Sequence, residues 1–408
     1  MKEDDVDMKY LVLLCDGMAD YKIGELDDKT PLEAANTPNM DKLSKDAIIG
    51  LVKTVADNMK PGSDVANLSV LGYDPNQYYT GRSPLEAGSI GIDMKPTDVS
   101  LRCNLVTLSD EANYEDKYIL DYCAGDIHTH EANELINYLK EHFDNDEFKL
   151  YNGISYRHCL IWNNGTLDVA ELTPPHDITG KNIKDYIPNN PNASKLYDMM
   201  VKSYELLKDH PINKEREARG QSPANSVWFW GEGVKATLTP FKDKFGISAS
   251  MISAVDLLKG IGKFAEMNVV EVENATGYID TNFEGKAKAC INEFRSGQDL
   301  VYVHIEAPDE CGHRNEIENK KRSLELIDKK VLGPILEALE EYDEYKVIIL
   351  PDHATPLALM THTNDPVPFM IYKKGYKGEG GIFSEDGAKE TGIFIENGPD
   401  IMKYFINI

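Results

Sequence analysis

The sequence predicts an α/β protein built around a parallel sheet. Three apolar runs, at residues 10–15, 300–305 and 347–350, have the length and apolar content of strands that are buried on both faces. From residue 246 onward, strand-like runs alternate with helical ones, and this alternation is typical of parallel strands joined by helices. We therefore expect a parallel sheet flanked by helices.

A chain of 408 residues is long for a single hydrophobic core, and the sequence pattern of its middle part differs from that of the rest. Residues 98–235 mix short strand-like pieces with loops rich in proline, asparagine and glycine, and they include one amphipathic helix at 194–208. We expect a smaller α+β domain here, inserted into a discontinuous sheet domain formed by residues 1–97 and 236–408.

Local signals predict the other elements of the sheet domain. Thr30 and Thr37 each precede a proline, the usual first helical residue after a capping hydroxyl, so we expect a helix that reaches Ala47. A short strand follows at 50–55. Further strands are expected at 249–252 and 269–272, and helices at 254–264, 284–294 and 316–339.

Carboxylate and imidazole side chains follow each of the three buried runs. In an open parallel sheet, residues just beyond the carboxyl ends of the strands form the functional crevice. The candidate ligands there are Asp16, Asp309, His313, Asp352, His353 and His362. Six ligands exceed the needs of one tetrahedral ion but suit two adjacent divalent ions, with manganese or zinc favoured over magnesium. The alternative is a set of capping and hydrogen-bonding groups.

Ser63 lies in a Pro-Gly-Ser turn that leads into an expected helix. A serine at this place has its oxygen near free backbone amides, so it is either a helix cap or a nucleophile. A nearby pair of cations would favour the nucleophile, because a cation stabilises the alkoxide at neutral pH.

The charge balance limits the partners. With 69 acidic and 43 basic residues the net charge is −26, which argues against nucleic acid or an anionic membrane. The six cysteines show no C-x-x-C spacing, the N-terminus is acidic, and no apolar run approaches the roughly 18 residues of a membrane span. We expect a cytoplasmic protein with a small-molecule substrate and leave its oligomeric state open.

An acidic protein that binds an anionic substrate needs several basic side chains close together at the binding site. In the insert, the candidates for this role are Arg102, His128, Arg157, His158, Arg216 and Arg219. Arginine presents a planar fork to phosphate or carboxylate, although any one of them could be a solvated surface residue. A turn places His128 near His130, and His128 could serve as general acid or base.

Motifs along nearly the whole chain resemble one family. They are C-D-G-M-A-D, G-S-D-V-A-N-L-S-V-L-G-Y-D-P, G-R-S-P-L-E-A, S-Y-R-H, P-A-N-S-V-W-F-W-G-E-G, A-T-G-Y-I-D-T-N, E-A-P-D-E-C-G-H, P-D-H-A-T-P and T-H-T-N-D-P-V-P. This set resembles the archaeal-type cofactor-independent phosphoglycerate mutases of the alkaline phosphatase superfamily. The resemblance implies an alkaline-phosphatase-like sheet, two divalent metals and a glycolytic phosphotransfer between 3- and 2-phosphoglycerate.

The resemblance also implies roles for individual residues. Asp309, His313 and His362 look like the ligands of one metal, while Asp16, Ser63, Asp352 and His353 look like those of the other. Ser63 resembles the serine that becomes phosphorylated. His128 and Arg157 look like catalytic groups, and together with Arg102, His158, Arg216 and Arg219 they look like residues on the substrate side.

Two positions of the sequence favour a different substrate. Asp126 and Trp230 stand where the archaeal pattern carries arginines, and an acidic residue would suit a cationic amino group. The runner-up is therefore homoserine kinase, which some bacterial members of this subgroup resemble. A simple phosphoester hydrolase and an inactive metal-stabilised binding protein are further alternatives.

Overall fold

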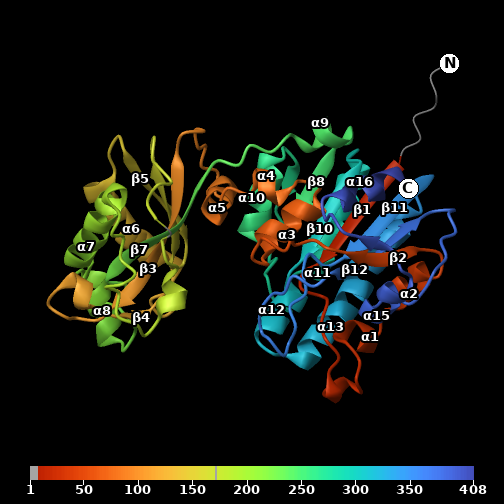
Figure 1. Ribbon diagram of the computed structural model, residues 1–408, viewed down its shortest axis with the longest axis horizontal. Coiled ribbons are helices and arrows are strands. Elements are labelled where there is room, and N and C mark those ends of the chain that lie inside the picture. The colour runs from red at the N-terminus through yellow and green to blue at the C-terminus, as the bar shows by residue number, and fades with distance from the viewer. Residues whose placement is uncertain (1–7, 171) are drawn as a thin grey trace. The chain divides into compact units, whose positions relative to one another are not determined.

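The computed structural model describes residues 8–170 and 172–408, which form two compact units (Figure 1). The first unit comprises the chain up to Tyr79 and Thr237–Ile408, and the second comprises Thr80–Ala236. The second of these boundaries lies one residue from the expected position, but the first precedes residue 97. Helix α5 (Arg82–Ser89) contacts two strands of the second unit, so the segment before residue 97 groups with the insert.

Within the described residues, the first unit contains an eight-stranded sheet. In spatial order its strands are β13 (Phe394–Ile395), β2 (Ile48–Val52), β12 (Val367–Lys373), β11 (Glu344–Leu350), β1 (Met8–Cys15), β10 (Leu300–Ile305), β8 (Ala249–Ile252) and β9 (Asn268–Val270). The five strands from β11 to β9 are parallel, as expected. Strand β12 was not expected, and it runs antiparallel to both of its neighbours.

Helices cover both faces of this sheet. Leu11 and Leu13 of β1 pack in one core with residues of α11 and α13. Tyr10 alternates to the other face, where its ring meets that of Phe405 in α16 edge-on, with the centroids 5.8 Å apart. Because neither face meets water, the central strands consist of continuous apolar residues rather than an alternating pattern.

The helices of the first unit connect these strands. Within the described residues they are α1 (Pro31–Ala34), α2 (Pro38–Ser44), α3 (Ser63–Val70), α4 (Pro75–Tyr78), α9 (Phe241–Phe245), α10 (Asp256–Phe264), α11 (Phe283–Arg295), α12 (Ala307–His313), α13 (Ile317–Ile327), α14 (Gly333–Leu339), α15 (Glu385–Glu390) and α16 (Asp400–Asn407). The long helix expected at 316–339 is interrupted by a π-helical turn at Asp328–Leu332. The buried Asp328 accepts hydrogen bonds from the backbone amides of Asn39 and Met40, so it caps α2 from a distance.

The second unit pairs a five-stranded sheet with helices. Its elements are α5, β3 (Val99–Leu108), β4 (Ile119–Asp121), α6 (Thr129–Phe143), β5 (Phe148–Ile154), β6 (Arg157–Trp162), α7 (Ser194–Leu207), α8 (Pro211–Ala218) and β7 (Ser226–Val234). The sheet is antiparallel, with β3 between β6 and β7. None of the described helices has the length and apolar content that a bilayer crossing requires.

Candidate metal centre

The centre lies where three neighbouring strands of the first unit end. Strand β1 lies between β10 and β11, and the parallel register aligns Cys15 with Ile305 and Leu14 with Leu350. Residues that follow these positions therefore emerge at one edge of the sheet. Asp16 follows β1 directly, and its backbone amide donates to the carbonyl of Ile305 at 3.0 Å.

One group of possible ligands consists of Asp16, Asp352 and His353. Their ligand atoms all lie within 4.8 Å of one another, and all three residues are buried. His353 Nε2 lies 3.4 Å from Asp352 Oδ2 and 3.7 Å from Asp16 Oδ1. Ser63 Oγ lies 3.2 Å from the same nitrogen.

A second group of possible ligands lies beside the first and shares His353 with it. Asp309, His353 and His362 have ligand atoms within 4.8 Å of one another. His313 Nε2 lies 3.3 Å from Asp309 Oδ2 and 2.9 Å from His362 Nε2. The structure thus brings all six strand-end candidates together with Ser63.

Ser63 is the first residue of α3, and the preceding Gly62 occupies the capping position. Gly62 has no side chain to accept a hydrogen bond from the helix amides. The Ser63 hydroxyl is directed instead at the His353 ring. The free amides at the start of the helix leave partial positive charge near this oxygen.

The electrostatics of the centre fit a divalent cation. The pKa of Asp16 is raised well above its usual value, first because burial disfavours the carboxylate and then because Asp352, Asp309 and Glu306 add negative charge. Asp16 Oδ1 is buried and has no hydrogen-bond partner among the described residues. In the described part of the chain, no lysine or arginine pairs with the three aspartates of the two groups. A bound cation would supply the positive charge that buried carboxylates require.

One of these carboxylates also shifts the pKa of a histidine in the centre. The hydrogen bond from His313 to Asp309 raises the pKa of His313 to about 9, even though burial opposes this shift. His313 Nδ1 also lies 3.0 Å from the carbonyl oxygen of Met360. Histidine and aspartate side chains around one point form a mixed nitrogen and oxygen donor set, which suits zinc and manganese.

Several polar residues that support the centre were missed by the sequence analysis. Asn67 Nδ2 donates to Asp352 Oδ2 at 2.7 Å and to the Ser63 carbonyl at 2.8 Å. Thr355 Oγ1 donates to Asp309 Oδ1 and lies 3.2 Å from His353 Nδ1. The signal for Asn67 was its spacing of one helical turn from Ser63.

A third missed residue, His304, interrupts the apolar run of β10. Its Nε2 lies 2.9 Å from Asp16 Oδ2, and the residue is completely buried. A polar residue inside a strand buried on both faces was the signal that could have found it.

The cationic candidates of the second unit have more varied surroundings. Arg216 is 1% exposed and donates to Glu131, to the Ala124 carbonyl at 2.7 Å and to the Ser222 carbonyl at 2.9 Å. Arg219 is half-exposed and donates to the other oxygen of Glu131. One carboxylate therefore pairs with both arginines.

Arg102 is paired in a similar way. Its Nε lies 2.9 Å from Glu86 Oε2, and its guanidinium lies 4.2 Å from the centroid of the Trp230 ring. Arg157 is exposed and lies against the ring of Tyr156.

The two histidine candidates, His128 and His158, have different surroundings. His128 directly precedes α6, and its ring stacks on that of His130 with the centroids 5.9 Å apart. His158 is buried, and burial lowers its pKa to about 3, so the ring is neutral at pH 7.

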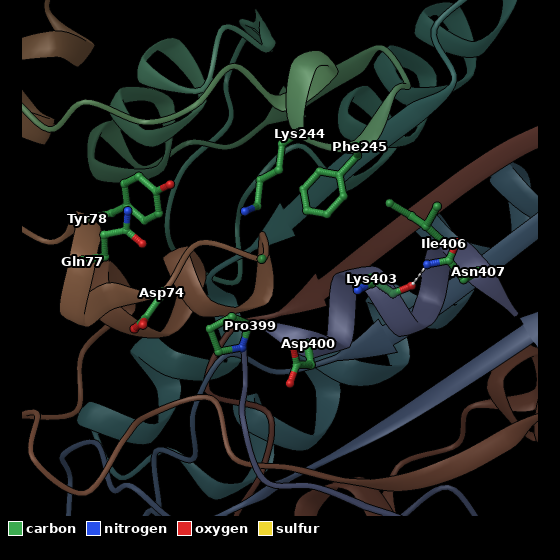
Figure 2. A pocket seen from close by; sticks show the side chains of 11 residues that line it. Asp74, Gln77, Tyr78, Lys244, Phe245, Pro399, Asp400, Lys403, Ile406 and Asn407 are labelled. Carbon is green, nitrogen blue, oxygen red and sulfur yellow. Dashed lines mark hydrogen bonds between the residues drawn. The ribbon is translucent and has the colours of Figure 1, made fainter.

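A cavity of about 500 Å³ lies elsewhere in the first unit (Figure 2). It is lined by residues that follow α3, by the end of α9 and by α16. Lys244 and Lys403 line it together with Asp74 and Asp400, so its charges are balanced. None of the candidate ligands lines this cavity.

Fold and site together define an α/β protein with a strand-end centre suited to divalent metals. A family model described as 2,3-bisphosphoglycerate-independent phosphoglycerate mutase matches residues 44–213. A probable enzyme of that name from Geobacter sulfurreducens is 44% identical over 402 residues, which cover 98% of this chain and 100% of the relative. One from Methanosarcina barkeri is 46% identical over 398 residues, which cover 97% and 98%. The chain belongs to the 2,3-bisphosphoglycerate-independent phosphoglycerate mutase family.

Solved structures agree with this fold. A protein from Pyrococcus horikoshii, PH0037, superposes with a TM-score of 0.83 at 28% identity and covers 98% of this chain and 97% of its own. A cofactor-independent phosphoglycerate mutase from Thermoplasma acidophilum superposes with a TM-score of 0.66 at 23% identity, with coverages of 98% and 99%.

Proposed function

We propose that this protein interconverts 3-phosphoglycerate and 2-phosphoglycerate through a phosphorylated serine. The observation that carries the proposal is the position of Ser63 Oγ, 3.2 Å from Nε2 of His353, a residue that belongs to both ligand groups. A hydroxyl in this position is suited to attack a phosphoryl group held at the centre. The names of the relatives support the same reaction.

Two divalent ions would be held by residues of the first unit. Asp309, His313 and His362 would bind one ion, and Asp16, Ser63, Asp352 and His353 the other. When bound, such ions lower the pKa of a coordinated hydroxyl and stabilise negative charge on phosphoryl oxygens. The mixed donor set favours manganese or zinc, with magnesium as a third option.

The chain's own residues would carry the phosphoryl group through two transfers. In the first, a bond forms between Ser63 Oγ and phosphorus while the bond from phosphorus to the glycerate oxygen breaks. In the second, a bond forms between phosphorus and the oxygen of the other glycerate hydroxyl, which loses its proton, while the bond from phosphorus to Ser63 Oγ breaks and restores the free serine oxygen. His128 would exchange protons with the glycerate hydroxyls, and Arg157 would bind the anionic substrate together with other cations of the second unit.

A cytoplasmic location fits this function. All six cysteines are buried and free of disulfides, as expected in a reducing compartment. The substrate is a small phosphorylated metabolite, and the net charge of −26 disfavours nucleic acid and anionic membranes as partners.

The experiment that tests the proposal is a paired assay on metal-loaded protein. One arm measures conversion of 3-phosphoglycerate to 2-phosphoglycerate, and the other measures phosphohomoserine formed from ATP and L-homoserine. We expect turnover in the first arm alone. Turnover in the second arm alone would replace the mutase with homoserine kinase, and release of inorganic phosphate alone would indicate a hydrolase.

A further inference from the structure

The two oxygens of the Asp16 carboxylate have different surroundings. Oδ2 lies 2.9 Å from His304 Nε2. Oδ1 faces the centre, 3.7 Å from His353 Nε2, and is buried without a hydrogen-bond partner among the described residues. The carboxylate is thus held through one oxygen while the other is free to bind a cation.

His304 is itself held at its second ring nitrogen. Ser253 Oγ lies 3.1 Å from His304 Nδ1, and the backbone amide of Val255 donates to the same Oγ at 3.0 Å. When Asp16 is ionised, as a cation ligand must be, its carboxylate can only accept a hydrogen bond, so the proton on His304 Nε2 is then directed at Asp16. This chain of contacts determines the plane of the imidazole ring.

The backbone of His304 is anchored as well. The ammonium group of Lys286 donates to the carbonyl oxygen of His304 at 2.9 Å. His304 and Lys286 are completely buried, and Ser253 is 3% exposed. A ring enclosed in this way has little freedom to move when the carboxylate beside it changes partner.

We propose that His304, oriented by Ser253, is a positioning residue that sets the affinity of the centre for a divalent cation by holding Asp16 Oδ1 toward it. The inference rests on the proposed metal centre and goes beyond it by naming residues that are not ligands. Outer groups that orient ligand side chains typically change metal affinity about 10- to 100-fold when they are removed. In the described hydrogen-bond network, His304 contacts Asp16 and none of the other proposed ligands. Loss of His304 should therefore weaken the binding of one of the two ions.

The test is titration of metal-free, full-length protein with Mn²⁺ by isothermal titration calorimetry. His304→Leu removes the donor to Asp16, whereas His304→Gln retains an N–H group. Ser253→Ala leaves the imidazole in place but removes its support. The matched control is Ser203→Ala, which removes another buried serine, in the second unit, whose hydroxyl donates to the Met200 carbonyl at 2.7 Å.

We expect His304→Leu to weaken one Mn²⁺ site by about 10- to 100-fold and leave the other near the wild-type affinity. His304→Gln should recover part of the loss, Ser253→Ala should shift the same site by a smaller factor, and Ser203→Ala should bind as the wild type does. Thermal unfolding of the metal-free proteins separates a loss of affinity from a loss of folding.

Wild-type affinity in folded His304→Leu would overturn the inference. If His304→Leu fails to fold, the Mn²⁺ affinity of Ser253→Ala tests the inference instead. Wild-type affinity in Ser253→Ala would then overturn the inference. Failure of the wild-type protein to bind Mn²⁺, Zn²⁺ or Mg²⁺ would instead overturn the proposed metal centre itself.

Discussion

Ser63 Oγ lies 3.2 Å from His353 Nε2, although the two residues are 290 positions apart in the chain. Ser63 begins α3, whereas His353 follows β11 at the edge of the sheet. The contact places a hydroxyl among six carboxylate and imidazole side chains in the first unit.

Ser63→Ala should abolish mutase turnover, lowering kcat by on the order of 1,000-fold or more, because no other group would supply the nucleophile. The matched control is Ser69→Ala on the same helix, whose buried hydroxyl has no hydrogen-bond partner among the described residues. This control should retain wild-type turnover. Initial rates of 2-phosphoglycerate formation measure both variants, and normal turnover in Ser63→Ala would contradict the phosphoserine mechanism.

Removal of divalent metal should lower the thermal unfolding midpoint. Asp16 and its neighbouring carboxylates repel one another when no cation is present, and this repulsion raises the pKa of Asp16 beyond the effect of burial. Metal at 100 times its Kd should restore about 2.7 kcal/mol of stability. The measurement compares chelator-treated protein with and without Mn²⁺, using K⁺ at equal ionic strength as the control. An unchanged midpoint would argue against a metal in this centre.

Arg216→Met should destabilise the second unit by about 3–5 kcal/mol, because it removes one partner of a buried ion pair. Arg219→Met should cost less than about 1 kcal/mol, since that arginine is half-exposed. Chemical denaturation of both variants measures the difference. A stability cost for Arg219→Met equal to that for Arg216→Met would contradict the structural role assigned to Arg216.

Arg219→Met also tests a predicted substrate contact. If Arg219 binds substrate, Arg219→Met should raise KM for 3-phosphoglycerate while the protein stays folded. An unchanged KM would leave the pairing with Glu131 as the role that the structure supports for Arg219.

The buried His158 should make stability depend on pH. Its folded pKa, about 3, is lower than its ordinary value of 6.5, so the unfolded chain binds the additional proton in acid. The contribution to stability is therefore present above pH 6.5 and is lost as the pH falls toward 3. At pH 5.5 the loss should be about 1.4 kcal/mol relative to pH 7.5.

Thermal unfolding of wild type and His158→Gln between pH 5 and 8 measures this effect. The substituted side chain does not titrate, so the difference in stability between the two proteins should change in favour of His158→Gln as the pH falls. Parallel pH profiles would show that His158 is not buried in its neutral form.

Much of the sheet could be predicted because buried strands appear in the sequence as short runs of consecutive apolar residues. The run at 300–305 coincides with β10, and the runs at 10–15 and 347–350 lie within β1 and β11. Strand β12 was missed because Pro368 within Val367–Lys373 argues against a central strand. Pro368 lies opposite Leu51 of β2, but the pairing with β11 covers only Met370–Lys373, so the proline stands near the beginning of the strand and interrupts no pairing on that side.

In the second unit, the expected turn around His128 and His130 is the start of a 15-residue helix, α6. The spacing of Leu135, Ile136 and Leu139 is helical, and these residues face the core of the unit. The two histidines stack at the beginning of this helix, which explains their proximity without a tight turn.

The residues that follow the strands can be read from the amino-acid sequence, because a run of apolar residues ends where a buried strand leaves the core. Asp16 and His353 could be recognised in this way. The groups that these side chains contact are known only from the folded chain. His304 lies 288 positions from Asp16, and Glu131 lies 85 positions from Arg216. Contacts over such separations depend on how strands and helices pack, and the spacing of neighbouring residues in the sequence does not reveal that packing.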